Sequence, residues 1–328
     1  MLPHTMQAIE MTTSGGPDVL KMAERALPSW GADEVLIKVA ASGVNGPDIA
    51  QRKGLYPPPP GASDLIGLEV SGTIVAVGSQ VTRWKEGDEV CALTNGGGYA
   101  EYVNAPAAQC LAIPENVSLV DAAGLPETYF TVWNNFFLDL EHTQGTLFLV
   151  HGGAGGIGST AIQLGVSQGL RVFTTCSTDE KAGFCKQLGA ERIINYNDED
   201  FVEIVKSAGG AGLILDMLGG DYVDRNFAAA APDGLIVQLA FNRGAKVTAN
   251  LAPLMMKRLT LTGSTLRPRS AEFKARIASD LEAKIWPRLK AGEIKTVTHT
   301  TFPSDDVQSA HELMESSGHM GKILLTWA

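Results

Sequence analysis

Residues 147–158 constrain the fold of this chain more than any other stretch. Four apolar residues, Leu147-Phe-Leu-Val150, run directly into glycines spaced as G-x-G-x-x-G, and a helix-like pattern begins at Ser159. In such a unit the first glycine permits a tight turn, the second lets backbone approach a pyrophosphate, and the third lets helix pack on strand. Unpaired N–H groups and the helix dipole favour an anion there. The predicted dinucleotide-binding loop consists of Gly153, Ala154, Gly155, Gly156, Ile157 and Gly158.

The end of the next apolar run decides which dinucleotide is expected. NAD-preferring sites place a carboxylate about 20 residues after the glycines, where it binds the ribose 2′-hydroxyl. Here Arg171-Val-Phe-Thr-Thr-Cys176 ends without one, and Ser177-Thr178-Asp179-Glu180-Lys181 follows. Hydroxyls and a lysine suit a 2′-phosphate, which a carboxylate would repel. Asp179 and Glu180 fit the first turn of the next helix, so the sequence favours NADPH over NADH.

Size and composition indicate a cytoplasmic enzyme of two domains. The 328 residues exceed one typical domain, and 45% hydrophobic with 19% charged residues is ordinary for a globular protein. A net charge of −10 argues against nucleic acid or an anionic membrane as a partner. The sequence has no apolar run of the about 20 residues that span a bilayer and no secretory signal. The four cysteines are scattered, without metal-ligand spacing.

The pattern of apolar and turn-forming residues changes near residue 122. Before it, short β-like runs alternate with Gly, Pro and Asp, which predicts a compact, barrel-like β domain. After it, apolar runs alternate with helical stretches, which predicts right-handed βαβ units on a parallel sheet. The predicted parallel strands are Leu147–Val150, Arg171–Cys176, Arg192–Ile194, Leu213–Met217, Leu235–Leu239 and Leu259–Thr262. A helix over Ala271–Leu289 and a strand over Lys322–Trp327 end the chain. We therefore expect a nucleotide domain at 122–264 inserted into a catalytic domain of residues 1–121 and 265–328.

Landmarks in a fixed order run along essentially the whole chain. They are Gly43-Val-Asn45-Gly-Pro-Asp48, Gly54-Leu-Tyr56 with four prolines, Gly67-Leu-Glu69, Gly87-Asp88, the glycine loop, Gly189-Ala190, Asn195-Tyr196, Leu215-Asp216-Met-Leu-Gly219-Gly220 and Gly321-Lys322. Together they resemble the medium-chain dehydrogenase/reductase superfamily, and within it the zinc-independent quinone oxidoreductases of the branch containing zeta-crystallin and the p53-inducible quinone reductase. The resemblance implies an α/β fold with a GroES-like β-rich catalytic domain and a Rossmann doubly wound parallel sheet. It also implies an active site in the cleft between them and a homodimer or homotetramer.

Departures from the zinc-dependent relatives predict a metal-free site. Those relatives have a cysteine where this chain has Asn45 and a histidine where it has Leu68. Neither side chain here is a useful zinc ligand. The four-cysteine lobe that holds a structural zinc is also missing, because Cys91 leads through a glycine-rich turn straight into the next strand.

The resemblance assigns three residues to the substrate end of the site. Tyr56 is expected to line the pocket and hydrogen-bond the substrate oxygen, or to pack on the proline cluster. Asn45 is expected to hydrogen-bond cofactor or substrate, while Asp48 caps the following helix. Thr131 matches a position near the nicotinamide, with an ordinary helix threonine as the alternative.

The resemblance assigns further residues to the cofactor. Lys181 and Tyr196 match positions that clasp the 2′-phosphate, and Thr178 adds a hydroxyl; for Lys181 the alternative is a solvated surface lysine. Phe241-Asn242-Arg243 resembles the loop that covers the nicotinamide end.

Three other residues have both a functional and a structural interpretation. Arg267 and Lys322 are expected to reach phosphate or ribose, or else to be surface charges. His151, at the end of the first nucleotide strand, is expected to complete the hydrogen bonds of the loop rather than to carry protons.

These features predict hydride transfer to an electron-poor small molecule. Without zinc the pKa of an alcohol is not lowered for oxidation, whereas a quinone needs mainly position and electrostatics. The sequence therefore predicts an NADPH-dependent quinone oxidoreductase. Reduction of the C=C bond of an enal or enone is one alternative, and a cofactor-binding protein with little turnover is another.

Overall fold

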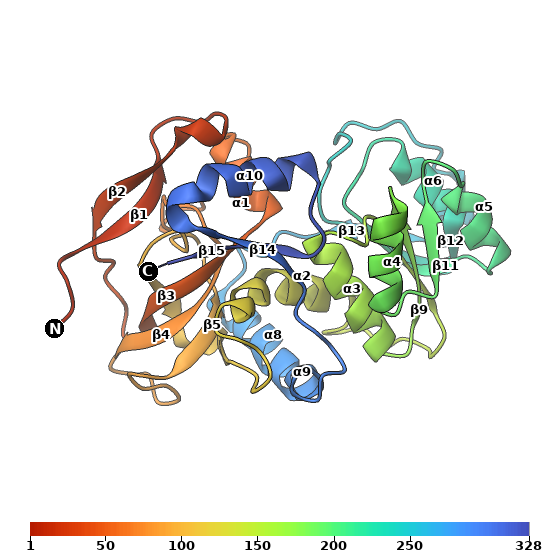
Figure 1. The fold of residues 1–328 in the computed structure, drawn as a ribbon. Coiled ribbons are helices and arrows are strands. Elements are labelled where there is room, and N and C mark those ends of the chain that lie inside the picture. The colour runs from red at the N-terminus through yellow and green to blue at the C-terminus, as the bar shows by residue number, and fades with distance from the viewer. Residues whose placement is uncertain (328) are drawn as a thin grey trace. The chain divides into compact units, whose positions relative to one another are not determined.

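The computed structural model describes residues 1–327, which divide into two compact units (Figure 1). The first contains residues 1–131 and the chain from Arg267 onward, and the second contains Val132–Leu266. The first division falls inside helix α2 (Pro126–Phe136), later than the predicted boundary after residue 121. The second unit is thus inserted between two segments of the first.

The first unit is built on a mostly antiparallel sheet of seven strands. Its order is β14-β15-β3-β4-β5-β7, with β6 paired to β3. The bounds are β3 Glu34–Val44, β4 Glu69–Val77, β5 Glu89–Leu93, β6 Tyr102–Pro106, β7 Cys110–Ala112, β14 Thr298–Pro303 and β15 Lys322–Thr326. Strands β1 (Thr5–Met11) and β2 (Leu20–Ala26) form a separate antiparallel ribbon. The strand nearest the end of the chain, β15, therefore lies inside the sheet.

Helices pack around this sheet. They are α1 Gly46–Arg52, α8 Ala271–Lys284, α9 Trp286–Lys290 and α10 Val307–Ser316, together with the first part of α2. The predicted single helix over 271–289 is wrong in one respect, because the chain forms two helices that meet at Ile285. Pro287 lies in the first turn of α9, where the missing N–H of proline is harmless, whereas inside a longer helix it would break a hydrogen bond.

The second unit is a parallel sheet of six strands in the order β10-β9-β8-β11-β12-β13. The bounds are β8 Leu147–Val150, β9 Arg171–Cys176, β10 Arg192–Asn195, β11 Ala211–Asp216, β12 Ala230–Gln238 and β13 Thr260–Gly263. Counted from β8, this is the 3-2-1-4-5-6 order of the doubly wound nucleotide-binding fold. The predicted GroES-like and Rossmann architecture is confirmed.

Helices cover both faces of the parallel sheet. Helices α3 (Gly156–Ser167) and α4 (Asp179–Gln187) lie on one side, and α5 (Phe201–Ser207) and α6 (Tyr222–Ala229) on the other (Figure 1). A short helix, α7 (Ala252–Met256), precedes the edge strand β13. Because the strand order reverses between β8 and β11, the loop after β8 opens at the switch point where such sheets bind ligands.

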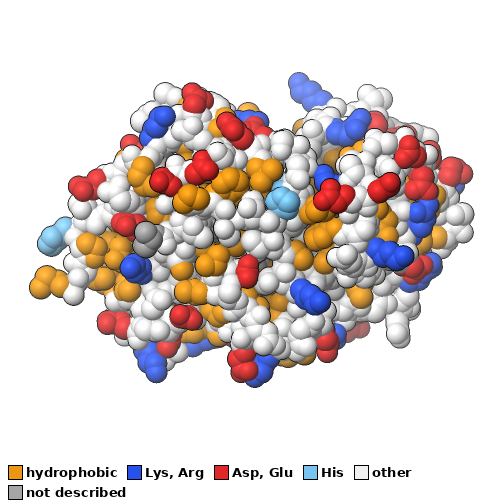
Figure 2. All heavy atoms as spheres, viewed as in Figure 1, with side chains coloured by type: hydrophobic (Ala, Val, Ile, Leu, Met, Phe, Trp, Pro, Cys, Tyr) orange, Lys and Arg blue, Asp and Glu red, His pale blue; other side chains and the backbone are white. Residues whose placement is uncertain are grey.

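The surface carries charges of both signs. On the face shown in Figure 2, lysine and arginine side chains are scattered among acidic ones and form no single basic patch. Among residues 1–327, no helix combines the length and the apolar character that crossing a membrane requires.

Candidate functional site

The loop after β8 has the shape of a phosphate cradle. A Cβ atom built on Gly153 would lie 2.0 Å from Thr174 Oγ1, and one on Gly158 would lie 2.2 Å from the Gly152 carbonyl oxygen. The first and third glycines are therefore required by packing. A Cβ on Gly155 would meet nothing closer than 3.7 Å, and no side chain caps α3 at this residue. Open space in front of uncapped N–H groups fits the pyrophosphate of a dinucleotide.

A buried polar network supports this loop from below. Nε2 of His151 donates to Asn226 Oδ1 at 2.8 Å, and Nδ1 accepts from Thr175 Oγ1 at 3.2 Å. The same hydroxyl oxygen accepts from the Gly152 N–H at 3.1 Å, and Asn226 Nδ2 donates to Asp216 Oδ2 at 3.0 Å. Burial lowers the pKa of His151, which keeps the ring neutral. The ring of His151 thus supports the loop only indirectly, through the Thr175 hydroxyl that bonds the Gly152 N–H.

Three residues expected at the 2′-phosphate meet at one edge of the parallel sheet. Thr178 is the N-cap of α4, where its Oγ1 accepts from the Lys181 N–H at 3.2 Å. Tyr196 follows the neighbouring strand β10, and its N–H donates to the Cys176 carbonyl oxygen at 3.1 Å. The Tyr196 side chain is 43% exposed, Thr178 is exposed and Lys181 is half-buried. All three side chains are thus accessible to a ligand, while phosphate binding by them stays a prediction.

The segment Phe241-Asn242-Arg243 folds back beside the end of β11. The Asn242 N–H donates to the Met217 carbonyl oxygen at 3.1 Å, and Arg243 Nε bonds Asp221 Oδ1 at 3.1 Å. Phe241 is 52% exposed. Main-chain bonds therefore hold the segment at the carboxyl edge of the sheet with an apolar side chain facing solvent, and its expected contact with nicotinamide stays a prediction.

In the first unit, Asn45 and Lys322 form one buried cluster with Glu69. Lys322 Nζ lies 2.6 Å from Glu69 Oε1 and donates to Asn45 Oδ1 at 2.5 Å. Asn45 Nδ2 donates to Glu69 Oε1 at 2.9 Å, and Glu69 Oε2 accepts from the Glu127 N–H at 2.8 Å. Lys322, Asn45 and Glu69 are all less than 10% exposed, so the alternative that Lys322 is a surface charge is wrong. Its predicted contact with phosphate or ribose stays a prediction.

Asp48 holds the start of helix α1. Its Oδ2 accepts from the Asn45 N–H at 2.8 Å and its Oδ1 accepts from the Gly67 N–H at 3.2 Å. Burial is the main cause that raises the pKa of Asp48 to about 7, although the two N–H groups and Lys322 oppose the shift. Asp48 therefore takes part in capping as predicted, but from the third position inside α1, whereas the N-cap itself is Asn45.

Tyr56 and Arg267 are also brought together. The guanidinium carbon of Arg267 lies 5.8 Å from the centre of the Tyr56 ring. Arg267 NH1 donates to Gln51 Oε1 at 2.7 Å and NH2 donates to the Asn95 carbonyl oxygen at 2.8 Å. Arg267 is 6% exposed, so its interpretation as a surface charge is wrong as well. Burial raises the pKa of Tyr56, which keeps its phenol protonated and able to donate.

Helix α2 carries one predicted residue and one that the sequence analysis missed. Thr131 is half-buried on this helix. Glu127 precedes Thr131 by four positions, which places the two on one helix face. Burial is the largest cause that raises the pKa of Glu127 to about 8, and nearby Glu69 and Asp48 add to the shift. The signal was present in the sequence, because the run Glu127-Thr-Tyr-Phe-Thr131 already carried the residue matched to the nicotinamide.

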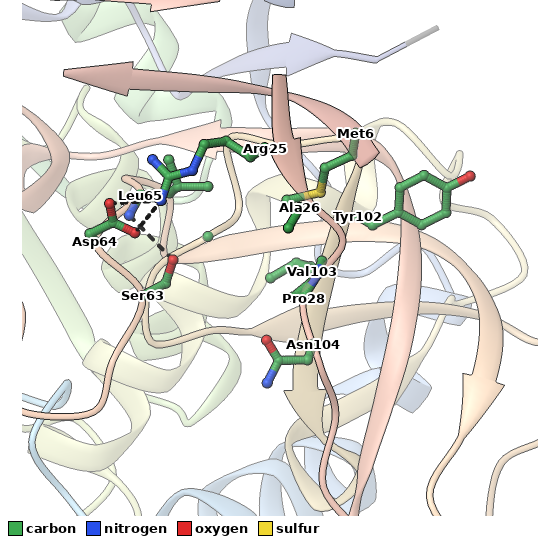
Figure 3. A pocket seen from close by; sticks show the side chains of 11 residues that line it. Met6, Arg25, Ala26, Pro28, Ser63, Asp64, Leu65, Tyr102, Val103 and Asn104 are labelled. Carbon is green, nitrogen blue, oxygen red and sulfur yellow. Dashed lines mark hydrogen bonds and ion pairs between the residues drawn. The ribbon is translucent and has the colours of Figure 1, made fainter. Parts of the chain in front are cut away.

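A separate shallow pocket in the first unit involves none of these residues. Its volume is about 170 Å³, and Figure 3 shows Arg25 reaching toward Asp64 at one end of it. Arg25 NH2 bonds Asp64 Oδ2 at 2.9 Å and NH1 bonds Glu10 Oε2 at 3.0 Å. Two carboxylates therefore hold the guanidinium of Arg25, and the pocket offers no unpaired cation to an anionic ligand.

Metal ligands are not assembled within residues 1–327, where no group of three or more His, Cys, Asp or Glu side chains could hold an ion. The amide of Asn45 is bonded to Glu69 and Lys322, and Leu68 is a buried apolar residue.

Two family models match the chain. The alcohol dehydrogenase GroES-like domain covers residues 31–115, and the zinc-binding dehydrogenase domain covers residues 156–281. Quinone oxidoreductase of Rattus norvegicus is 31% identical, with 98% of this chain and 97% of that protein covered. The Escherichia coli quinone oxidoreductase complexed with NADPH is 28% identical with a TM-score of 0.86, over 98% of this chain and 100% of that one. The CurK enoyl reductase is 26% identical with a TM-score of 0.84, over 99% of each chain.

The fold, the glycine loop and these relatives define an oxidoreductase with a dinucleotide site. The chain belongs to the quinone oxidoreductases of the medium-chain dehydrogenase/reductase superfamily.

Proposed function

We propose that this enzyme is an NADPH-dependent quinone oxidoreductase that acts without a metal ion. The observation that carries the cofactor assignment is the open cradle at Gly155, followed by Thr178 and Lys181 where an NAD site would have a carboxylate. Relatives named quinone oxidoreductases, one of them solved with NADPH, support the same assignment. The substrate class is a quinone or a similar conjugated carbonyl compound.

The residues of the second unit bind and orient the cofactor, which supplies a hydride when bound. Main-chain N–H groups of residues 153–158 hold the pyrophosphate. Lys181, Thr178 and Tyr196 surround the 2′-phosphate, where a cation and neutral donors suit a dianion. Residues 241–243 cover the nicotinamide end and exclude water from it.

The residues of the first unit act on the substrate. Tyr56 donates a hydrogen bond to the substrate oxygen and so stabilises the negative charge that develops there. Thr131 contributes a hydroxyl beside the nicotinamide. Asn45, held by Lys322 and Glu69, and Arg267, held by Gln51 and Asn95, fix the polar wall of the site.

The test is NADPH oxidation at 340 nm with 1,4-naphthoquinone or 9,10-phenanthrenequinone, run in parallel with NADH and with EDTA. We expect EDTA-resistant turnover that prefers NADPH. Turnover of an enal or enone but not of quinones would assign the enzyme to C=C reduction. Tight NADPH binding without turnover of either class would contradict both enzyme assignments and favour a binding protein.

We also infer a homodimer joined through the edge strand β13. All four residues of β13 are exposed. An exposed edge strand has unpaired backbone groups and is therefore prone to pair with a strand of another chain. The preceding helix adds exposed apolar side chains, with Met255 75% and Met256 66% exposed. A second copy, paired antiparallel along β13, would cover both features. We expect light scattering to give a dimer and Leu261→Lys with Met255→Lys to give a monomer; a wild-type monomer would refute this assembly and a tetramer would extend it.

We place the enzyme in the cytoplasm, where NADPH is regenerated. The four cysteines, all free and buried, fit a reducing compartment. Cell fractionation followed by immunoblotting tests this location, and recovery in an extracytoplasmic fraction would contradict it.

A further inference from the structure

The carboxyl group of Glu127 stands out among the polar groups of the first unit. Within residues 1–327 it accepts no hydrogen bond and forms no ion pair, although the backbone N–H of the same residue is fixed by Glu69 Oε2 at 2.8 Å. Its residue is half-buried rather than enclosed. The main chain is thus held firmly while the carboxyl group remains free to bond a ligand.

Glu127 lies near residues predicted for the substrate end of the site. After burial, the charge of Glu127 is the next cause that raises the pKa of Tyr56, and it opposes the lowering of the Arg267 pKa by burial; Tyr56 and Arg267 themselves lie against each other. Glu127 shares a helix face with Thr131, four residues further along α2. Glu127 is therefore placed with the side chains proposed to bind the substrate oxygen.

Charged groups on the neighbouring elements set its protonation. Glu69 on β4 and Asp48 on α1 disfavour a further negative charge, whereas Lys322 on β15 and Lys274 on α8 favour it. Both lysines are committed elsewhere: Lys322 to Glu69 and Asn45, and Lys274 to Asn95 Oδ1 at 2.6 Å and the Arg267 carbonyl oxygen at 2.9 Å. Burial and the two carboxylates prevail, and the pKa of Glu127 rises to about 8. The group therefore carries a proton at neutral pH.

Building on the proposed function, we propose that Glu127 is the catalytic acid that delivers a proton to the reduced substrate oxygen. A hydride brings two electrons and one hydrogen to the quinone, which leaves a hydroquinone monoanion. The O–H bond of the Glu127 carboxyl group then breaks and a new O–H bond forms on the anionic oxygen. The Glu127 carboxylate regains its proton from solvent, so each turnover consumes one hydride and one proton.

The first test is the pH dependence of quinone reduction by the wild-type enzyme. A carboxyl group donates only while protonated, so kcat should fall as pH rises through about 8. The rate should also fall in D2O. A rate that is flat between pH 7 and 9 and insensitive to D2O would overturn the proposal without any variant.

The second test is Glu127→Gln, which keeps the size of the side chain and removes the proton donor. We expect kcat to fall about 10²-fold, the usual contribution of general acid catalysis. The decrease of kcat near pH 8 (the basic limb of the pH profile) should disappear. The Kd for NADPH should stay unchanged. Glu127→Asp should restore the limb in part. Glu86→Gln, the same change at an exposed residue, is the control and should leave kcat unchanged.

The outcomes separate this inference from the proposed function. If the wild-type enzyme does not reduce quinones, the proposed function fails. If it does, and Glu127→Gln keeps the rate and the limb near pH 8, only the role of Glu127 is refuted. A limb that disappears in Tyr56→Phe but persists in Glu127→Gln would assign the proton to the tyrosine instead.

Discussion

Replacement of Lys322 by methionine tests the buried cluster that underlies the substrate end of the site. Lys322 is 6% exposed and Glu69 is fully buried, and their charged atoms are 2.6 Å apart. Removing one partner of a buried ion pair costs about 3–5 kcal/mol of unfolding free energy. Asn45 Nδ2 and the Glu127 N–H still donate to Glu69 in the variant. We therefore expect Lys322→Met to lower the unfolding free energy by an amount at the lower end of this range, about 3 kcal/mol.

Equilibrium unfolding in guanidinium chloride, followed by tryptophan fluorescence, measures this loss of stability in the first structural unit. Four of the five tryptophans lie in the first unit, at Trp30, Trp84, Trp286 and Trp327. Lys21→Met, the same change on an exposed lysine of β2, is the control and should shift the unfolding free energy by less than about 0.5 kcal/mol.

A double variant separates the ion pair from simple loss of packing. Glu69→Gln in the Lys322→Met background removes the unpaired charge, and its amide group can donate to the oxygen of Asn45 that lysine has vacated. We expect the double variant to recover at least half of the stability lost in Lys322→Met. The reasoning is refuted if the losses of unfolding free energy from the two changes simply add. It is also refuted if Lys322→Met alone loses less than about 1 kcal/mol of unfolding free energy.

Three further variants probe other features. Lys181→Ala should weaken binding of NADPH far more than of NADH, as measured by fluorescence titration; equal losses would contradict the 2′-phosphate assignment. Gly153→Ala should reduce NADPH affinity at least tenfold, because its Cβ would lie 2.0 Å from Thr174 Oγ1, whereas Gly183→Ala, where a Cβ meets nothing within 4 Å, should be neutral. Lys257→Met removes three hydrogen bonds from Nζ to main-chain carbonyl oxygens; it should lower the stability of the second unit by about 1–3 kcal/mol, and an unchanged Tm would show these bonds to be dispensable.

The sequence predicted the second unit well because local signals and tertiary structure agree there. An apolar run, a glycine turn and a helix start occur together, and the strands follow one another at βαβ spacing. The parallel sheet and the role of His151 as a support of the loop could therefore be expected from the sequence. The break between α8 and α9 was missed although Pro287, which a longer helix would not tolerate in its interior, stands in the sequence.

The first unit shows where prediction from sequence stops. Lys322 and Arg267 look like ordinary surface cations in the chain, and nothing local indicates that each is buried. Their partners lie far away in sequence: Asn45 is 277 residues from Lys322, and Gln51 is 216 residues from Arg267. For Glu127 the sequence offered only its spacing from Thr131, because the effect of Glu69 and Asp48 on its carboxyl group depends on the tertiary structure.

The position of β15 has a consequence for how the protein is made. This strand lies between β14 and β3, and the Trp327 N–H bonds the Ala40 carbonyl oxygen. During synthesis the second unit, contiguous from Val132 to Leu266, is complete while the first still lacks an interior strand. The Ala41–Val44 part of β3, which β15 pairs, therefore stays without its partner until β15 has been made, while β6 already pairs Glu34–Lys38. A truncation before Lys322 would remove β15 and would leave a folded nucleotide unit attached to an unfinished partner.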